Sequence, residues 1–173
     1  MKSNVQENVY YVRIVSNDWS LYIAATEKGL CFVGSHDEGY EEMKSWFAIR
    51  RSNAVLIEDL NRLSDYKEQL LEYLTGAREH FHLPIDSIGT DFQTAVWNEL
   101  QKIPFGKTAT YSDIAEQIRR PASVRAVGTA IGSNPVLIVV PCHRVIAKSG
   151  RMAGYRGGIP MKERLLGLER SLD

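Results

Sequence analysis

Near its C-terminal end the chain places a cysteine, a histidine and an arginine side by side: Cys142, His143 and Arg144, within the stretch VVPCHRVIAKSG. This combination allows three interpretations of the thiol. It can be a buried structural group, one half of a metal site, or a nucleophile whose proton a neighbouring histidine accepts. The residue types alone do not decide among the three, so the decision depends on the elements that position them.

A metal site has the least support. The sequence contains two cysteines, Cys31 and Cys142, without a C-x-x-C spacing, and among its four histidines His80 and His82 have no second pair of ligands nearby. Structural zinc sites use four ligands that usually come in such pairs. We therefore expect no metal, and in a reducing cytoplasm we expect no disulfide either.

The composition is that of a globular protein. Hydrophobic residues make up 44% of the 173 residues and charged residues 24%, and no apolar run is long enough to span a bilayer. The N-terminal stretch MKSNVQENVYYVRIV lacks the apolar core and the cleavage site of a secretory signal. We therefore expect a cytoplasmic protein with no membrane partner.

Charge is distributed unevenly along the chain, although the formal net charge is zero. Residues 1–90 hold 9 basic and 14 acidic residues, a net charge of −5, and residues 91–173 hold 12 basic and 7 acidic residues, a net charge of +5. A basic C-terminal half could face the phosphates of a nucleic acid. A merely solvated surface with uneven charge explains the counts equally well.

The first third of the chain has the pattern of a small antiparallel sheet. Three β-rich runs, residues 10–16, 20–26 and 30–34, follow one another through short connections. Cys31 falls within the third run, where a small buried hydrophobic residue is the expected role. Residues 55–78 change to helical spacing and predict a helix.

A turn at Gly89 marks the predicted boundary between two domains, residues 1–88 and 89–173. The first combines the sheet with a helix, and we interpret it as a scaffold. The expected fold class is α+β: a small N-terminal antiparallel sheet with a helix, followed by a mostly helical C-terminal domain that contains a helix-turn-helix.

Three short helices are predicted in the second domain. The first begins at Thr90, a candidate N-cap, and the other two cover residues 110–120 and 123–134. The last two, separated by a turn, fit a helix-turn-helix. Many small helix pairs bind nothing, but Arg125 near the start of the last helix favours contact with a nucleic acid.

Ahead of the cysteine stands a buried strand-like run, VLIVV at residues 136–140, which Pro141 ends. A thiol at the end of a buried strand would be partly accessible. His143 could then accept its proton, with a carboxylate to orient the imidazole. A structural cysteine beside a surface histidine fits these residues as well, so the pattern around Cys142 leaves both interpretations open.

Several longer motifs follow one another between Gly89 and Glu169: GTDFQTAVWNELQKIPFGKTATYSDIA, RAVGTAIGSNP, LIVVPCHRV and GYRGGIPMKERLLGLE. With them the chain resembles the O6-alkylguanine-DNA alkyltransferases, DNA repair proteins that take an alkyl group off damaged guanine. The N-terminal third is similar only in layout and in LLEYLTGAREHFHLPID. The combination is specific, whereas PCHR alone would not be.

The resemblance implies a direct transfer of the alkyl group to the protein. Cys142 would be the acceptor thiolate, His143 would act on it through a water, and Glu169 would orient His143. Asn134 would be a hinge between the recognition helix and the active-site turn. Tyr111 would help to rotate the target nucleotide out and would protonate the guanine as it leaves. The thioether product cannot be hydrolysed here, so the cysteine would be used once, without a cofactor.

The implied partner is double-stranded DNA that contains O6-alkylguanine, bound through the minor groove by a monomer. Arg125 would fill the gap that the flipped nucleotide leaves in the duplex. The implied DNA contacts on this helix are Ser123, Arg125, Ala126, Ala130 and Gly132.

The implied base pocket is lined by Val145, Tyr155, Arg156 and Gly157. Arg156 departs from the family pattern, because many relatives have a small residue there. We expect its side chain either to alter the rim of the pocket or to contact phosphate. The zinc ligands of some animal relatives have no counterpart in this chain, which again predicts no metal.

The sequence supports three rival functions less well. A non-catalytic relative that binds the lesion as a sensor would lack the acceptor cysteine. A methylation-sensing regulator would carry further metal-binding cysteines and a further domain. A Cys–His hydrolase would need an oxyanion hole and an acyl substrate, for which the sequence gives no sign.

Overall fold

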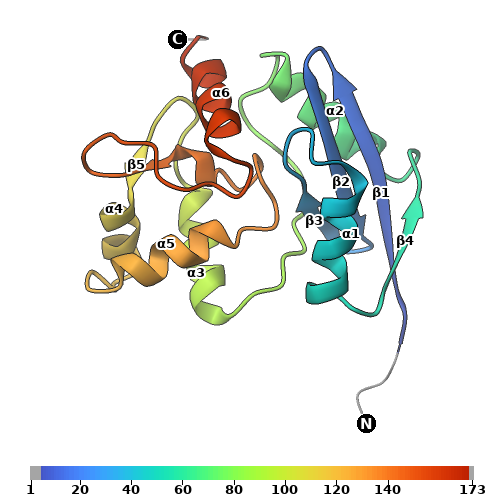
Figure 1. Cartoon of the computed structure of the whole chain (residues 1–173), viewed down its shortest axis with the longest axis horizontal. Helices are drawn as coiled ribbons and strands as arrows, with labels where there is room; N and C mark the ends of the chain where they lie inside the picture. The colour runs from blue at the N-terminus through green and yellow to red at the C-terminus, as the bar shows by residue number, and fades with distance from the viewer. Residues whose placement is uncertain (1–4, 172–173) are drawn as a thin grey trace. The chain divides into compact units, whose positions relative to one another are not determined.

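The computed structural model describes residues 5–171 of the chain (Figure 1). The chain falls into two compact units, Met1–Ser87 and Ile88–Asp173. Each unit has its own secondary structure and its own buried residues, so the two are described in turn.

Within the described residues, the first unit is built on a four-stranded sheet in the order β3-β2-β1-β4. β1 (Glu7–Ser16) and β2 (Trp19–Thr26) form an antiparallel hairpin, which β3 (Gly29–Val33) extends. The two-residue turn of the hairpin begins at Asn17, whose φ of 51° suits the tight turns that match the twist of paired strands. The expected antiparallel sheet is confirmed, with one addition: β4 (Ala54–Glu58) pairs with β1 in parallel.

The helix predicted over residues 55–78 is wrong in its first part. Residues 54–58 form β4, and the helix α2 begins only later (Ser64–Leu74). Val55 and Ile57 are β-branched residues that favour a strand, and pairing with β1 satisfies the backbone of the segment. Tertiary pairing therefore overrides the helical spacing of the leucines.

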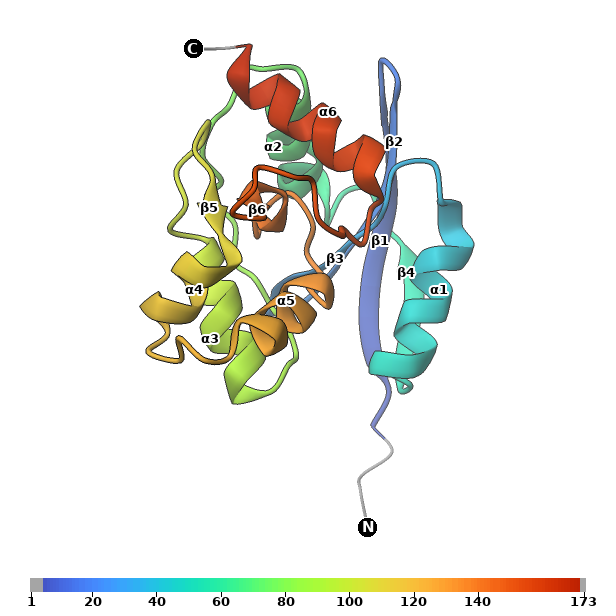
Figure 2. The same cartoon turned by 60° about the vertical axis from the view of Figure 1, so that its left-hand side comes forward.

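Helices cover both faces of the sheet. α1 (Gly39–Arg50) lies on one face and α2 on the other, as the views in Figures 1 and 2 show. No sequence pattern predicts α1, because only Met43 and Phe47 along it are buried. Both pack with Cys31 in one apolar cluster, so this cysteine is the buried hydrophobic residue that its strand predicts.

The mostly helical second half and the α+β fold class are confirmed, and Figures 1 and 2 show α3, α4 and α5 grouped at one end of this unit and α6 at the other. The elements described in the second unit are α3 (Asp91–Leu100), β5 (Ala109–Thr110), α4 (Tyr111–Gln117), α5 (Val124–Gly132), the one-turn 3-10 helix η1 (Cys142–Arg144), β6 (Val145–Ile146) and α6 (Ile159–Arg170).

α3 begins where the sequence predicts it. Thr90 Oγ1 accepts a hydrogen bond from the backbone N–H of Gln93, and the Gln93 side chain accepts one from the N–H of Thr90, which makes a capping box. Trp97 faces inward and donates its indole N–H to the carbonyl of Ala130 in α5, at 2.9 Å. A Cβ on Gly89 would come within 2.6 Å of that indole ring, so only glycine fits where the chain enters α3.

The two helices of the predicted helix-turn-helix are present, as α4 and α5, and they contact each other. Thr110 caps α4 through a second capping box, with Asp113. α4 stops at Gln117, and Arg119 takes a left-handed conformation with φ of 60° in the turn that follows. The turn therefore ends α4 before Pro121, which the sequence predicts as the breaker.

The strand predicted over residues 136–140 is not formed, although the whole run is buried. The backbone makes tight turns instead, with a hydrogen bond from the N–H of Val140 to the carbonyl of Val136 and a φ of 72° at Ile138. The Asn134 side chain binds the backbone at both Val136 and Val140. It thereby satisfies polar groups that a neighbouring strand would otherwise have to pair.

Candidate active site

Cys142 is the first residue of η1, directly after Pro141. Only 3% of its surface is exposed, so the partial accessibility expected from a strand end is wrong. The sulfur accepts a hydrogen bond from the side-chain amide of Asn134 at 3.2 Å. The thiol is therefore held inside the unit and already oriented by a neighbour.

The protonation of this thiol follows from its surroundings. Burial raises the pKa of Cys142, while the Asn134 hydrogen bond and the charges of Arg156 and Lys162 lower it, and the balance is a raised pKa. In the resting protein the group is therefore a thiol at neutral pH. A reaction that needs the thiolate also needs a base nearby.

Asn134 connects the end of α5 to the thiol. Its amide donates to the Val140 carbonyl at 2.9 Å as well as to Cys142, and its side-chain oxygen accepts the N–H of Val136 at 2.9 Å. The residue is almost completely buried. A single side chain thus fixes the whole turn that leads from α5 to η1.

His143 and Glu169 form a buried pair, in which His143 Nε2 lies 2.9 Å from Glu169 Oε1. Arg144 binds the same carboxylate through Nε at 3.0 Å and Nη2 at 2.7 Å, and donates Nη1 to the Ile103 carbonyl at 2.7 Å. Glu169 Oε2 also accepts the backbone N–H of Gly106, at 3.3 Å. The carboxylate is therefore held from two other segments of the unit, η1 and the turn at Gly106.

Both pKa values of this pair are lowered, although burial alone would raise that of the carboxyl. Burial raises the pKa of Glu169, but its hydrogen bonds to His143 and Arg144 outweigh burial and lower the pKa to about 2. Burial lowers the pKa of His143, and the contacts to Glu169 only partly oppose this. At neutral pH the site therefore holds a carboxylate and a neutral imidazole, which can accept a proton.

Two charged residues of this site have no role assigned from the sequence. One is Arg144, whose link to Glu169 spans 25 residues and leaves no local signal. The other is Lys162, which is 0% exposed and donates Nζ to the Val145 carbonyl at 2.6 Å. Its spacing to Leu165, Leu166 and Glu169 along α6 places Lys162 on the buried face, and this pattern could have indicated it.

Tyr111 lies at the start of α4, half-buried, with its ring beside Gly128 of α5: a Cβ at that glycine would stand 3.7 Å from Cδ1. Burial raises the pKa of Tyr111, and the proximity of Cys142 raises it further. The structure thus brings the tyrosine hydroxyl and the thiol into one site, although they are 31 positions apart in sequence.

α5 carries the residues predicted to contact DNA. Arg125, Ala126 and Gly132 are exposed and Ser123 is partly exposed. Ala130 is only 3% exposed, and it lies on the face of α5 toward Trp97. It therefore lies off the exposed face that the other four residues share.

The predicted pocket residues divide into two groups. Val145 is completely buried, in β6 next to β5, and so does not lie on an open surface in this structure. Tyr155, Arg156 and Gly157 are half-buried on the loop that precedes α6. The Arg156 side chain binds the backbone carbonyls of Asn134 and Pro135, just after α5, a contact that the sequence does not predict.

Two family profiles match the chain: the ribonuclease-like domain of 6-O-methylguanine DNA methyltransferase over residues 9–87, and the DNA binding domain of the same enzyme over residues 91–171. The chain belongs to the 6-O-methylguanine DNA methyltransferase family. This is the alkyltransferase family that the sequence motifs resemble, and the resemblance is confirmed. As a 6-O-methylguanine DNA methyltransferase, the chain is a DNA-binding transferase of DNA repair.

Individual relatives agree along the full length. The chain is 50% identical over 170 residues to the inducible methylated-DNA–protein-cysteine methyltransferase of Bacillus subtilis, with 98% of this chain and 94% of that protein covered. The crystal structure of the Mycobacterium tuberculosis O6-methylguanine methyltransferase superposes with a TM-score of 0.82 at 39% identity, covering 95% and 94% of the two chains. A structure of M. tuberculosis OGT in complex with DNA has a TM-score of 0.79 at 37% identity, covering 94% of each chain.

Two features are absent from residues 5–171. No group of three or more His, Cys, Asp and Glu residues there is arranged to hold a metal ion. No helix in the same range has the length and apolar character needed to cross a membrane.

Proposed function

We propose that this methyltransferase moves the alkyl group from O6 of an alkylated guanine in DNA to Sγ of Cys142. The bond between O6 and the alkyl carbon breaks as the bond between sulfur and that carbon forms. The observation that carries the proposal is the buried series from Asn134 to Cys142 and from His143 to Glu169. A saturated carbon requires a strong, soft nucleophile, which a thiolate supplies better than a hydroxyl.

Formation of the thiolate is the first step. Because the pKa of Cys142 is raised and that of His143 is lowered, the resting pair is a thiol and a neutral imidazole. His143 takes the thiol proton through a bridging water as substrate enters. Glu169 stays ionised and stabilises the imidazolium that results.

Departure of the guanine is the second step. Tyr111 has a raised pKa, so its hydroxyl carries a proton at neutral pH and can donate it to the leaving base. His143 then passes the proton that it received from the thiol to Tyr111, which regenerates the neutral tyrosine. The overall transfer leaves a thioether and an unmodified guanine. The alkyl group passes directly between the two atoms, so the reaction uses no cofactor and each protein molecule acts once.

The target base has to leave the duplex before it can reach a buried thiol, at a cost of a few kcal/mol. We propose that α5 lies in the minor groove, with Ser123, Ala126 and Gly132 against the DNA. Arg125, exposed at the start of α5, fills the gap in the stack. The excess of 12 basic over 7 acidic residues in 91–173 supports this orientation toward phosphates.

The two domains divide the work. Residues 89–173 contain every residue assigned here to DNA binding and alkyl transfer, and we propose that residues 1–88 act as a scaffold. One acceptor thiol serves one lesion, so a monomer suffices for the reaction. We therefore expect the protein to act as a monomer on double-stranded DNA.

The test is the mass of the protein after incubation with a duplex that contains one O6-methylguanine. Wild type should gain one methylene, about 14 Da, on the peptide that contains Cys142, at one methyl per protein. Cys142→Ala should abolish the gain and still bind DNA. Cys31→Ala is the matched control: Cys31 is completely buried in the sheet of the first unit and its pKa is raised to about 12, so transfer should persist.

Two outcomes would count against the proposal. Methylation of a residue other than Cys142 would overturn the assignment of the acceptor. An unchanged mass together with tight binding of the alkylated duplex would favour the lesion sensor instead.

A further inference from the structure

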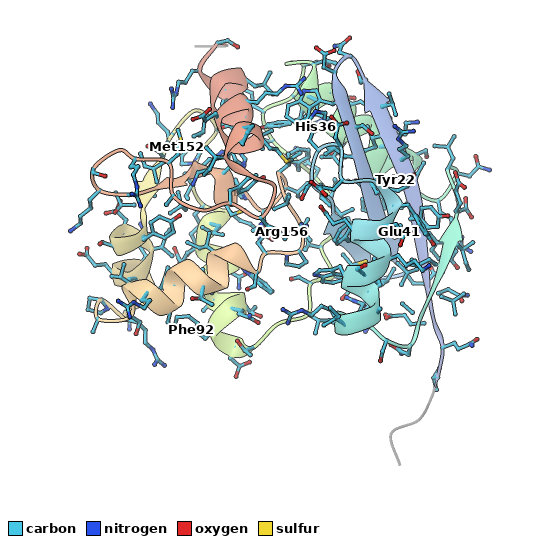
Figure 3. The ribbon with its side chains drawn as sticks, viewed as in Figure 1. Tyr22, His36, Glu41, Phe92, Met152 and Arg156 are labelled. Carbon is cyan, nitrogen blue, oxygen red and sulfur yellow. The ribbon has the colours of Figure 1, made fainter. Side chains whose placement is uncertain are left out.

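The loop between β6 and α6 carries an arginine whose contacts the sequence does not predict. The Arg156 guanidinium turns onto the backbone just beyond α5: Nε donates to the carbonyl of Asn134 and Nη2 to the carbonyl of Pro135, each at 3.2 Å. Figure 3 labels Arg156 near this end of α5. The arginine therefore connects two segments of the second unit that are 22 residues apart in sequence.

The first acceptor belongs to the residue that holds the thiol. Asn134 receives Arg156 on its backbone carbonyl and donates its side-chain amide to Cys142 Sγ, at 3.2 Å. Arg156 is thus two hydrogen bonds from the sulfur. Any shift of the 134–135 backbone also moves the amide that bonds the thiol.

The position suits an arginine in particular. Carbonyls just after the C-terminal end of a helix carry partial negative charge, and α5 has no basic residue in its own last turn. Arg156 supplies that cation from another segment. Its N–H groups are held in one plane, so they can reach two neighbouring acceptors at once, whereas a lysine ammonium is a point charge on a flexible stem.

We propose that Arg156 is a positioning residue for the alkyl transfer, clamping the loop that carries Tyr155 and Gly157 onto the Asn134–Pro135 turn. This inference rests on the proposed transfer to Cys142. The clamp fixes the loop beside the turn before DNA binds, so the base meets a preformed site. It also keeps the Asn134 amide on the sulfur.

The charge of Arg156 also favours the thiolate form of Cys142, because it lowers the pKa of the thiol. Burial raises the pKa of Cys142, and after the Asn134 hydrogen bond the Arg156 and Lys162 charges lower it. The other ionisable groups around the thiol are Tyr111 at the start of α4 and His143 in η1, with Glu169 of α6 bound to His143. Removal of Arg156 therefore raises the pKa of the thiol, while lysine at this position retains the charge.

The experiment compares Arg156→Ala and Arg156→Lys with wild type. Arg151→Ala is the matched control, because Arg151 is an exposed arginine of the same loop and its loss removes the same charge. One measurement is the single-turnover rate of methyl transfer from an O6-methylguanine duplex, at limiting and at saturating DNA. The other is the pH dependence of Cys142 alkylation by iodoacetamide in the protein without DNA.

Arg156→Ala should lower the rate at saturating DNA about tenfold, which corresponds to about 1.4 kcal/mol. Its affinity for DNA should fall no further than that of Arg151→Ala. The midpoint of iodoacetamide alkylation should move to higher pH. Arg156→Lys should restore this midpoint without restoring the rate, because the charge returns and the two-point clamp does not.

Three results would overturn the inference. A loss of DNA affinity beyond the control, with an unchanged rate at saturation, would make Arg156 a phosphate contact. A rate and a midpoint equal to those of wild type in Arg156→Ala would leave it without a role in transfer. Full recovery of the rate in Arg156→Lys would show that charge alone is enough.

The design separates this inference from the function on which it rests. If wild type fails to methylate Cys142, the proposed function fails. The link between Arg156 and the thiol is then judged by the iodoacetamide profile alone, which requires no DNA. An unmoved midpoint in Arg156→Ala would overturn the link in that case as well.

Discussion

Replacement of Arg144 by methionine tests whether Arg144, which binds the same Glu169 carboxylate as His143, helps to keep His143 neutral. Arg144 donates to this buried carboxylate at 2.7 and 3.0 Å and to the Ile103 carbonyl at 2.7 Å. Methionine fills much of the same space without a charge. Because removal of one partner from a buried ion pair leaves the other charge desolvated, we expect Arg144→Met to lower the free energy of unfolding by about 3–5 kcal/mol.

The same substitution changes the protonation of the imidazole. Burial lowers the pKa of His143, the contacts to Glu169 raise it, and the charge of Arg144 lowers it again. Without Arg144 the pKa of His143 rises, so a larger fraction is imidazolium at neutral pH and cannot accept the thiol proton. Methyl transfer should therefore slow at neutral pH, and its pH dependence should move to higher pH.

Three measurements examine this prediction: urea-induced unfolding followed by circular dichroism, the NMR titration of His143, and the single-turnover rate as a function of pH. Arg170→Met is the control, because Arg170 is an exposed arginine on α6, next to Glu169, and its replacement should change stability by less than about 0.5 kcal/mol. A loss below about 1 kcal/mol in Arg144→Met, with an unmoved pKa of His143, would refute the reasoning.

Two further predictions concern stability. The pKa of Glu169 is lowered from 4.5 to about 2 in the folded protein, so its stabilisation is present above pH 4.5 and is lost as the pH falls toward 2; this amounts to about 3 kcal/mol. The free energy of unfolding should therefore fall less between pH 4.5 and pH 3 in Glu169→Gln than in wild type. Equal falls in the two proteins would contradict this. Gly89→Ala places a Cβ 2.6 Å from the Trp97 indole, which its hydrogen bond to Ala130 holds in place, and should cost about 1–3 kcal/mol. Gly167→Ala, at an exposed helical site with open space around it, should instead stabilise α6 by up to about 1 kcal/mol, and a similar loss in both variants would remove the steric explanation.

Local chemistry explains the parts of the fold that were predictable. Thr90 and Thr110 each begin a helix because their hydroxyls and the side chains three residues later satisfy the free N–H groups of the first turn. The hairpin between β1 and β2 follows from two β-rich runs and a short polar turn. These signals lie within a few residues of one another, so a single sequence contains them.

Features that depend on distant partners were not predictable in the same way. Residues 54–58 become a strand because β1 is available to pair with them, and residues 136–140 become turns because Asn134 binds their backbone. Arg144 and Lys162 find their acceptors 41 and 17 residues away, respectively. The family motifs indicated Cys142, His143 and Glu169 as a group, but not the burial of the thiol.

The contacts that hold Glu169 also decide when this site can form during folding. The carboxylate joins Gly106, 63 residues earlier in the chain, to Arg144, 25 residues earlier. Contacts between residues so far apart close large loops. They form late in folding, because the chain loses conformational entropy on loop closure before these contacts stabilise it. A chain in which α6 has not yet docked has no carboxylate beside His143. In the proposed mechanism the thiol reacts only once, and its base is therefore held in place only in a second unit that has finished folding.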